Sequence, residues 1–158
     1  MPTEFRRPES VLVVVYTDDG EALLLRRQRP FEFWQSVTGS LLEGETHEQA
    51  ARRELAEETG LRGAGRLVYS GVSRQFTIDP RWRNRFAPGI VENVEFEWRY
   101  RLSEAADIAL QLDEHSDFRW LPVAEASEAV WSWTIFESTT KCSAKPCLMS
   151  ISRAIRTG

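Results

Sequence analysis

The first part of the chain alternates between short apolar runs and turn signals. Val11–Tyr16 is a continuous β-branched run that stops at the sequence Thr-Asp-Asp-Gly over 17–20. Such a run predicts a strand buried on both faces, and the similar run at Ala22–Arg26 predicts its partner in a hairpin. A further short extended segment is expected at Val37–Gly39.

One helix is marked at both of its ends. Thr46 and Gln49 have the spacing of a capping box, in which each side chain satisfies an N–H group at the start of the helix. Gly60 suits the position just after the last helical residue, which often needs a positive φ. The sequence therefore predicts a helix from Thr46 to Thr59.

The rest of the chain predicts further strands around one long loop. Strand-like runs cover Arg66–Ile78, Val94–Leu102 and Phe118–Leu121, and a helix with proline at its first position is expected over Pro122–Val130. Residues 79–89 form a loop rich in arginine and aromatic residues. Because loops of this length are uncommon in compact domains unless they carry function, we expect a functional loop.

Length and composition indicate one ordinary globular domain. The chain has 158 residues, with no internal repeat or linker, which favours a single domain with a sizeable core. We expect a domain over residues 1–134 and an atypical C-terminal tail over 135–158, either part of that domain or frayed. The net charge of -4 argues against a nucleic-acid partner, although a small local anion site stays compatible with it.

Targeting signals are not recognisable in the sequence. The N-terminus has no apolar run behind a basic flank, and no segment is long and apolar enough to span a membrane. Cys142 and Cys147 lie close together near the C-terminus rather than spread as a disulfide framework. We therefore expect a cytoplasmic protein with reduced thiols and without a membrane partner. The oligomeric state is left open.

Three glutamates on the first helix form the candidate chemical site. Glu54, Glu57 and Glu58 stand at i, i+3 and i+4, so that their carboxylates share one helix face and repel one another. A solvated acidic face is the common explanation of such a pattern, but closely spaced carboxylates are also the ligands that Mg²⁺ or Mn²⁺ prefers. Arg53 is spaced to fix Glu57, and Glu45 offers another oxygen before the helix.

The spacing around these glutamates is more specific than the cluster itself. Gly39, Glu45, Arg53, Glu54, Glu57, Glu58 and Gly60 follow the pattern G-x5-E-x7-R-E-U-x-E-E-x-G-U, in which U is aliphatic, at every specified position. This pattern resembles the Nudix box. The resemblance implies an α/β (α+β) fold with a mixed sheet sandwiched between helices, and a hydrolase that cleaves a diphosphate linkage with Mg²⁺, or Mn²⁺, as cofactor.

Segments outside the box resemble one bacterial branch of that family, whose members release pyrophosphate from a pterin triphosphate in folate biosynthesis. They lie over roughly residues 5–133 and comprise Arg7-Pro8, the run Phe33–Ser40, the run Arg85–Gly89, Asn93, Glu95, Glu114-His115 and Trp131–Trp133. The resemblance implies that Glu114 completes a metal site with Glu54, Glu57 and Glu58. It implies catalytic roles for Glu58, Glu57 and Arg53, with Glu58 as the first choice of general base.

The same resemblance implies contacts with a small-molecule triphosphate. By position, they fall on Arg6, Arg27, Thr38, Phe76, Thr77, Ile78, Asp79 and Ser132, and Arg85 joins them through its loop. Guanidinium groups suit phosphate oxygens, although basic residues at strand ends are often plain surface residues. Phe76 is placed either against a flat heterocycle or in the core.

Other residues receive structural interpretations. His47 and His115 are expected to be exposed or to lie behind the metal ligands, and Trp82, Trp98, Trp120 and Trp131 are expected in the core, with Trp34 undecided. Two rival functions remain at this stage. One is a Nudix enzyme that hydrolyses nucleoside triphosphates, as in nucleotide-pool sanitising, and the other is a non-catalytic ligand sensor.

Overall fold

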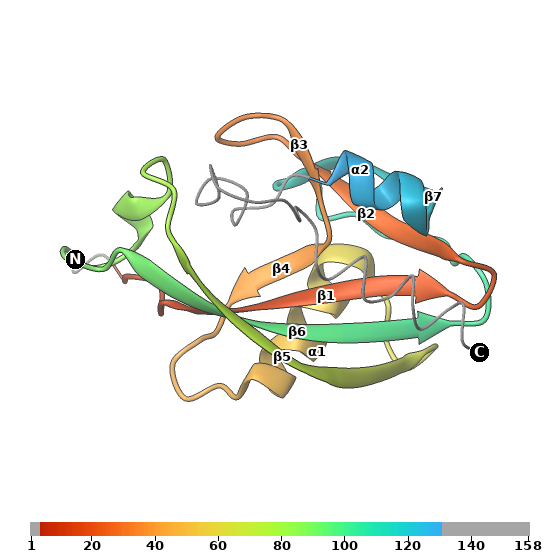
Figure 1. Cartoon of the computed structure of the whole chain (residues 1–158), viewed down its shortest axis with the longest axis horizontal. Helices are drawn as coiled ribbons and strands as arrows, with labels where there is room; N and C mark the ends of the chain where they lie inside the picture. Colours follow the sequence, from red (N-terminus) through yellow and green to blue (C-terminus); the bar gives the residue numbers. More distant parts are fainter. Residues whose placement is uncertain (1–3, 131–158) are drawn as a thin grey trace.

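The computed structural model describes residues 4–130 of the chain. Its elements are, in order, β1 (Glu9–Thr17), β2 (Glu21–Arg27), β3 (Phe33–Gln35), β4 (Val37–Ser40), α1 (His47–Thr59), β5 (Arg66–Thr77), the 3₁₀ turn η1 (Arg83–Arg85), β6 (Glu92–Leu102), β7 (His115–Pro122) and α2 (Val123–Ala129) (Figure 1). The expectations for Ser132, for the tryptophans at 131 and 133, for both cysteines and for the 135–158 tail lie outside the described residues.

The strands form a mixed sheet around β1. The sheet has seven strands, with the main order β3-β2-β1-β6-β5, while β4 pairs with β1 and β7 with β2. β6 runs parallel to β1 over the whole length of β1, and the other strand pairs are antiparallel. The expected β1–β2 hairpin is present, but its register has a single pair, Tyr16 with Ala22. β2 then diverges to pair with β3 and β7, which leaves room for β4 beside the first half of β1.

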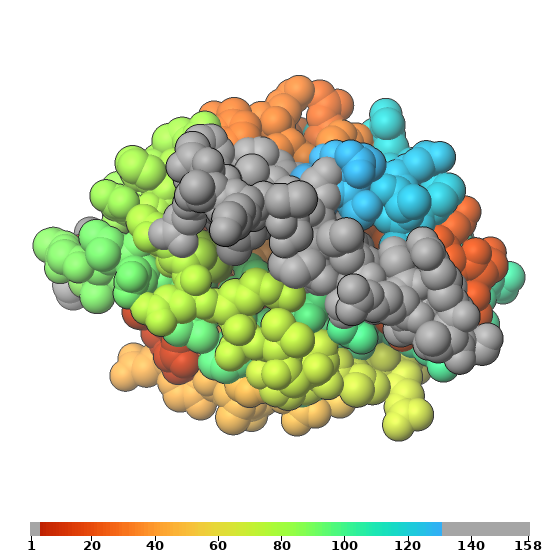
Figure 2. Space-filling model, in the orientation of Figure 1, coloured from red at the N-terminus to blue at the C-terminus, as the bar shows by residue number. Residues whose placement is uncertain are grey.

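The two helices cover opposite faces of the sheet because side chains alternate along β1. Val11, Val13 and Val15 pack with Ala51 and other residues of α1 in one buried cluster. Alternate residues such as Val14 pack with β2 and α2 in a second cluster. The expected mixed sheet sandwiched between helices is thus confirmed. In the space-filling view, α2 and β7 (blue) adjoin the orange β2–β3 segment (Figure 2).

The predicted caps hold α1 in place. The Thr46 hydroxyl accepts from the amide of Gln49, and the Gln49 side chain accepts from the amide of Thr46. Gly60 adopts φ 76° and donates its N–H to Ala56. The helix is therefore confirmed, with Thr46 as its cap rather than its first helical residue.

The long arginine-rich loop is partly a structural unit. Trp82 and Phe86 from this loop pack against Phe33 and Ile78 in a third buried cluster. Between the two aromatic residues the chain makes the η1 turn. The loop is therefore anchored by its aromatic side chains, which places its arginines on a fixed backbone.

Several sequence predictions need correction in detail. Trp82 and Trp98 are buried, but Trp120 is only half-buried, and Pro122 caps α2 instead of occupying its first turn. His47 is not exposed: it is half-buried, stacks on Phe96 and accepts a hydrogen bond from Trp98. Among residues 4–130, no helix is long and apolar enough to cross a membrane.

Candidate active site

A cavity of about 630 Å³ opens beside the start of β1, where β4, α1, β5 and β6 meet. Its volume is typical of a small-molecule site. Charged groups and apolar groups both line it: Glu4, Phe5, Arg6, Arg7, Ser10, Arg27, Thr38, Gly39, Ser40, Leu41, Leu42, Glu43, Arg53, Glu54, Phe76, Ile78, Trp82, Phe86, Asn93, Glu95 and Glu114.

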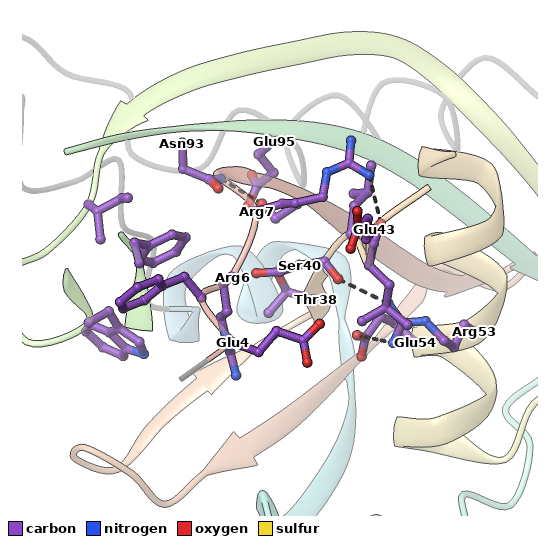
Figure 3. A pocket seen from close by; sticks show the side chains of 18 of the residues that line it. Glu4, Arg6, Arg7, Thr38, Ser40, Glu43, Arg53, Glu54, Asn93 and Glu95 are labelled. Atoms are coloured by element: carbon purple, nitrogen blue, oxygen red, sulfur yellow. Dashed lines mark hydrogen bonds and ion pairs between the residues drawn. The ribbon is translucent and has the colours of Figure 1, made fainter. Parts of the chain in front are cut away.

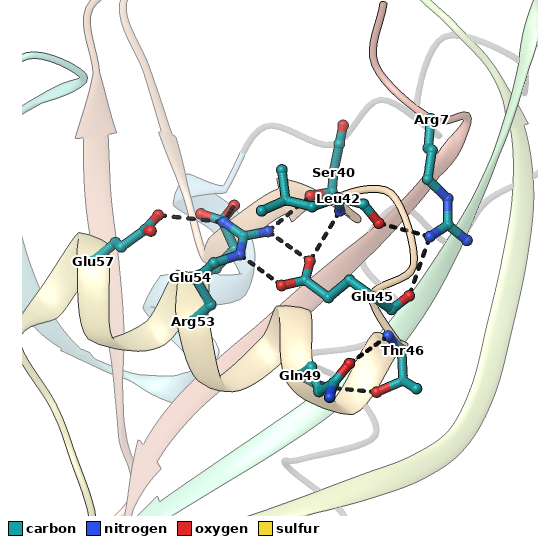
Figure 4. A network of polar contacts seen from close by, with 9 residues as sticks. All are labelled: Arg7, Ser40, Leu42, Glu45, Thr46, Gln49, Arg53, Glu54 and Glu57. Atoms are coloured by element: carbon teal, nitrogen blue, oxygen red, sulfur yellow. Dashed lines mark hydrogen bonds and ion pairs between the residues drawn. The ribbon is translucent and has the colours of Figure 1, made fainter.

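Arg53 organises the acidic side of the cavity (Figure 4). Its guanidinium binds the Glu45 carboxylate through two hydrogen bonds of 2.8 and 2.9 Å, and it also donates to Glu54 and to the Ser40 carbonyl. The hydrogen bonds from Arg53 lower the pKa of Glu45. Both Glu45 oxygens are therefore engaged, since Oε1 also accepts from the amide of Leu42. The sequence suggested Glu45 as a source of another metal oxygen. In the structure, its carboxylate fixes the loop before α1.

Glu54 and Glu58 both point inward from α1: Glu58 is fully buried, and the Glu54 side chain is 13% exposed. Burial raises the pKa of Glu54 to about 7, against the opposing effect of Arg53. Burial, followed by the charges of Glu54 and Glu114, raises the pKa of Glu58 well above its ordinary value. One Glu58 oxygen accepts from the amide of Thr38 at 3.2 Å, and the other has no hydrogen-bond partner among the described residues.

Glu57 lies at the edge of this group. Its side chain is 48% exposed, and its carboxylate is 3.3 Å from Arg53. Arg53 therefore contacts Glu57 as expected, but its shorter contacts are with Glu45 and Glu54.

Residues at the start of β7 complete the cluster. Ligand atoms of Glu58, Glu114 and His115 lie within 4.8 Å of one another. His115 is fully buried, which excludes exposure and leaves the other expectation, a place beside the metal ligands; its Nε2 lies 3.0 Å from the side-chain amide of Gln35. Burial lowers the pKa of His115 to about 4, which keeps the imidazole neutral at neutral pH. In the sequence, only the position of His115 next to Glu114 could have indicated that it lies in this cluster.

The donor set fits a divalent cation. A buried carboxylate oxygen without a partner and several carboxylates that raise one another's pKa are costly when left alone. Oxygen-rich clusters of this kind are the ligands that Mg²⁺ and Mn²⁺ prefer, and a neutral imidazole is compatible with Mn²⁺.

Three arginines lie close to one another, and two of them, Arg27 and Arg85, also lie close to Glu114. Arg27 is 8% exposed and lies within the fields of Glu114, Glu58 and Arg6. The Arg6 amide donates to the Arg85 carbonyl at 2.8 Å, which ties the N-terminal segment to η1. Burial and the charges of Arg6 and Arg27 lower the pKa of Arg85, and its buried Nη1 has no partner within residues 4–130. This concentration of positive charge suits an anionic ligand.

The remaining expected contact residues divide into two groups. Thr38, Phe76 and Ile78 line the cavity. Phe76 and Ile78 are also buried, so Phe76 belongs both to the core and to the cavity wall. Thr77, Asp79 and Arg85 are not among the described lining residues. Asp79 instead binds Arg81 through two hydrogen bonds, at 2.9 and 2.6 Å.

The sequence did not single out one side of the cavity as a binding surface. Ser10 on β1 and Asn93 and Glu95 on β6 are buried and line it. Asn93 and Glu95 had appeared only among residues of the family branch. Their spacing of two places both on one face of β6, which was the available signal.

The chain is similar in sequence to known proteins. Residues 6–139 match the family model described as NUDIX domain. The chain is 38% identical over 134 residues to dihydroneopterin triphosphate diphosphatase of Escherichia coli strain K12, covering 82% of this chain and 88% of the relative. It is 37% identical over 142 residues to the protein of the same name from Haemophilus influenzae, covering 87% and 89%.

A solved structure gives the same result. The dihydroneopterin triphosphate pyrophosphohydrolase of E. coli superposes with a TM-score of 0.76 at 37% identity, covering 82% of this chain and 90% of that one.

Proposed function

Because the chain belongs to the Nudix family of hydrolases, we propose that it hydrolyses 7,8-dihydroneopterin triphosphate to dihydroneopterin monophosphate and pyrophosphate, a step of folate biosynthesis. Both curated relatives and the solved structure that carry this activity in their names match more than four fifths of the chain.

The observation that carries the proposal is the meeting of opposite charges at one end of the cavity. Arg27 lies close to two carboxylates, those of Glu58 and Glu114. It also lies close to two other guanidinium groups, those of Arg6 and Arg85. A triphosphate needs both kinds of group, because cations on carboxylates and guanidinium groups each neutralise phosphate oxygens. Apolar side chains such as Phe76 and Ile78 line the same cavity.

We assign the metal to Glu54, Glu57, Glu58 and Glu114, with Mg²⁺ as the expected ion and Mn²⁺ as the substitute. When bound, the ion supplies charge neutralisation on phosphate oxygens and a lower pKa for an attacking water. Arg53 keeps Glu54 in place and holds the loop through Glu45.

Glu58 is the proposed general base. Its Oε2 is held by the Thr38 amide, which leaves Oε1 to accept a proton from the attacking water. Burial raises the pKa of this carboxyl, and a cation held by the neighbouring carboxylates would oppose that rise and keep Glu58 ionised until it takes the proton. Arg6, Arg27 and Arg85 hold the phosphates and stabilise the charge that moves onto the leaving pyrophosphate.

The test is a substrate screen of the full chain with Mg²⁺. Dihydroneopterin triphosphate is compared with the common nucleoside triphosphates, and pyrophosphate release is measured separately from phosphate release. Pyrophosphate release fastest from the pterin supports the proposal. Faster turnover of a nucleoside triphosphate would identify that nucleotide, rather than the pterin, as the substrate. Release of neither product would favour the hypothesis of a non-catalytic ligand sensor.

A further inference from the structure

Asn93 and Glu95 form a polar wall on the side of the cavity away from Glu54 and Arg53 (Figure 3). Both project from the same face of β6, and Ser10 is the register partner of Glu95 on the parallel strand β1. The proposed metal ligands come instead from α1 and the start of β7. The wall is therefore a distinct part of the cavity, set on the paired strands β1 and β6.

This wall carries hydrogen-bond acceptors that the described chain does not use. Asn93 is 3% exposed, and its amide donates to the Ser10 hydroxyl at 2.8 Å, while its Oδ1 is buried without a partner among residues 4–130. Glu95 is 6% exposed, and the charged groups that affect its pKa are Arg74 and Glu97. Buried acceptors without donors are destabilising, so a ligand that brings donors gains affinity here.

A purely structural role for Glu95 is poorly supported by its neighbours. The positive group opposite it in the register is Arg74, but the Arg74 guanidinium lies 3.5 Å from a carboxylate oxygen of Glu97. Arg99 also points to Glu97, at 3.9 Å. Arg74 and Arg99 thus both interact with the carboxylate of Glu97. Glu95 is left facing the cavity, and burial raises its pKa to about 7.

The walls beside these acceptors are apolar and largely aromatic. Phe76 is the register partner of Asn93, and Ile78, Trp82 and Phe86 follow it around the cavity. All four side chains are buried. Aromatic and branched apolar side chains of this kind form a slot for a planar ring, and the acceptors then meet the edge of that ring.

We infer that Asn93 and Glu95 recognise the 2-amino-4-oxopyrimidine edge of a pterin ring. The Glu95 carboxylate accepts from the ring N–H and from the adjacent exocyclic amine, and Asn93 Oδ1 accepts the remaining amine hydrogen. This inference rests on the proposed function, because the phosphates must then extend toward Arg27 and Glu114. It makes the pair a determinant of specificity rather than of catalysis.

The donor pattern makes the inference selective. A guanine presents the same amine and N–H side by side and is expected to share the wall in part. An adenine presents an amine next to a ring acceptor, so it would place a lone pair against the carboxylate. A site built to pair with N–H groups rejects ligands that lack them, because its own acceptors are left unpaired.

The experiment compares wild type with Glu95→Gln and with the matched control Glu97→Gln. Residue 97 lies on the same face of the same strand and is fully buried, but it is not among the described lining residues. KM and kcat are measured for dihydroneopterin triphosphate, GTP and ATP. We expect Glu95→Gln to raise KM for the pterin about 10- to 100-fold, the size of a hydrogen bond to a charged group, with kcat changed less than about threefold.

Binding without turnover separates this inference from the proposed function. Neopterin triphosphate and ATP are titrated against each variant with EDTA present, and the pterin fluorescence or ligand competition gives Kd. A Kd for the pterin that rises in Glu95→Gln but not in Glu97→Gln supports the inference even if wild type hydrolyses another substrate faster. Equal changes for pterin and ATP, an unchanged Kd in Glu95→Gln, or a wild type that does not discriminate the two ligands overturns it.

Discussion

The carboxylate of Glu54 fills the space beside the backbone of Gly39 where a Cβ atom would lie. A side chain at residue 39 would overlap both oxygens of Glu54 and its carboxyl carbon. The backbone of Gly39 has no positive φ, so the glycine is required for space and not for its conformational freedom. The first glycine of the motif thus lets β4 approach the acidic face of α1.

Gly39→Ala is therefore expected to displace Glu54 while leaving the fold intact, because a flexible side chain gives way more easily than the sheet. We predict a loss of about 10²- to 10³-fold in kcat, as for a misplaced charged group in an active site. Steady-state kinetics and thermal unfolding measure the two effects. A drop in Tm as large as that of a core mutation would contradict the assignment.

Arg53→Lys tests the network around the loop before α1. Lysine cannot reproduce the paired hydrogen bonds to Glu45 together with those to Glu54 and Ser40. Glu54 would then lose the contact that positions its carboxylate, so we expect activity to fall about 10- to 100-fold. The control is Arg52→Lys: Arg52 is exposed, and its ion pair among residues 4–130 is with Glu48, one turn earlier on the helix. Equal activities of the two variants would show that the network is dispensable.

Glu58→Gln tests the proposed base. The amide keeps the hydrogen bond from Thr38 and the shape of the side chain, so we expect the fold to persist and the rate to fall about 10²- to 10⁴-fold. Binding of Mg²⁺ is measured in parallel, since a lost ligand lowers affinity and a lost base lowers kcat at saturating metal. Activity equal to that of wild type would refute the assignment.

Arg85→Ala tests whether the long loop contacts the phosphates. Of the three arginines in residues 81–85, Arg81 binds Asp79 and Arg83 donates to the Ile78 carbonyl, while Arg85 lies close to Arg6 and Arg27. We expect Arg85→Ala to raise KM about tenfold or more, with a smaller loss in kcat. Arg81→Ala serves as the control. An unchanged KM in Arg85→Ala would remove the loop from the binding site.

The pH dependence of stability tests the burial of Glu95. Its pKa is raised to about 7 by burial, so the folded state binds a proton that the unfolded state releases above its ordinary pKa near 4.5. The free energy of unfolding should therefore fall as pH rises from about 4.5 to 7, by at most about 3 kcal/mol from this group.

Glu95→Gln should remove that part of the pH dependence. Relative to wild type, the variant should gain stability at about pH 8 and gain little at about pH 5, which urea unfolding at both values measures. A stability difference that is the same at both values would show that Glu95 ionises freely in the folded protein.

Local interactions made much of the site predictable. The capping box, the glycine after α1 and the shared face of Glu54 and Glu58 depend on residues a few positions apart, and the helix period alone relates them. The motif spacing identified the family for the same reason. Charge pairs inside the motif, such as Arg53 with Glu57, were visible as well.

The tertiary structure decided which groups share the cavity. Arg6 and Arg27 come from distant segments and line the cavity together with Asn93 of β6, while Arg85 and His115 lie beside it. Pairing between distant strands depends on the packing of the whole sheet, which no local pattern encodes. The sequence by itself therefore determined the carboxylates of α1 and the chemistry they support. Only the fold decided what faces them across the cavity, because burial and register, rather than spacing in the chain, set those neighbours.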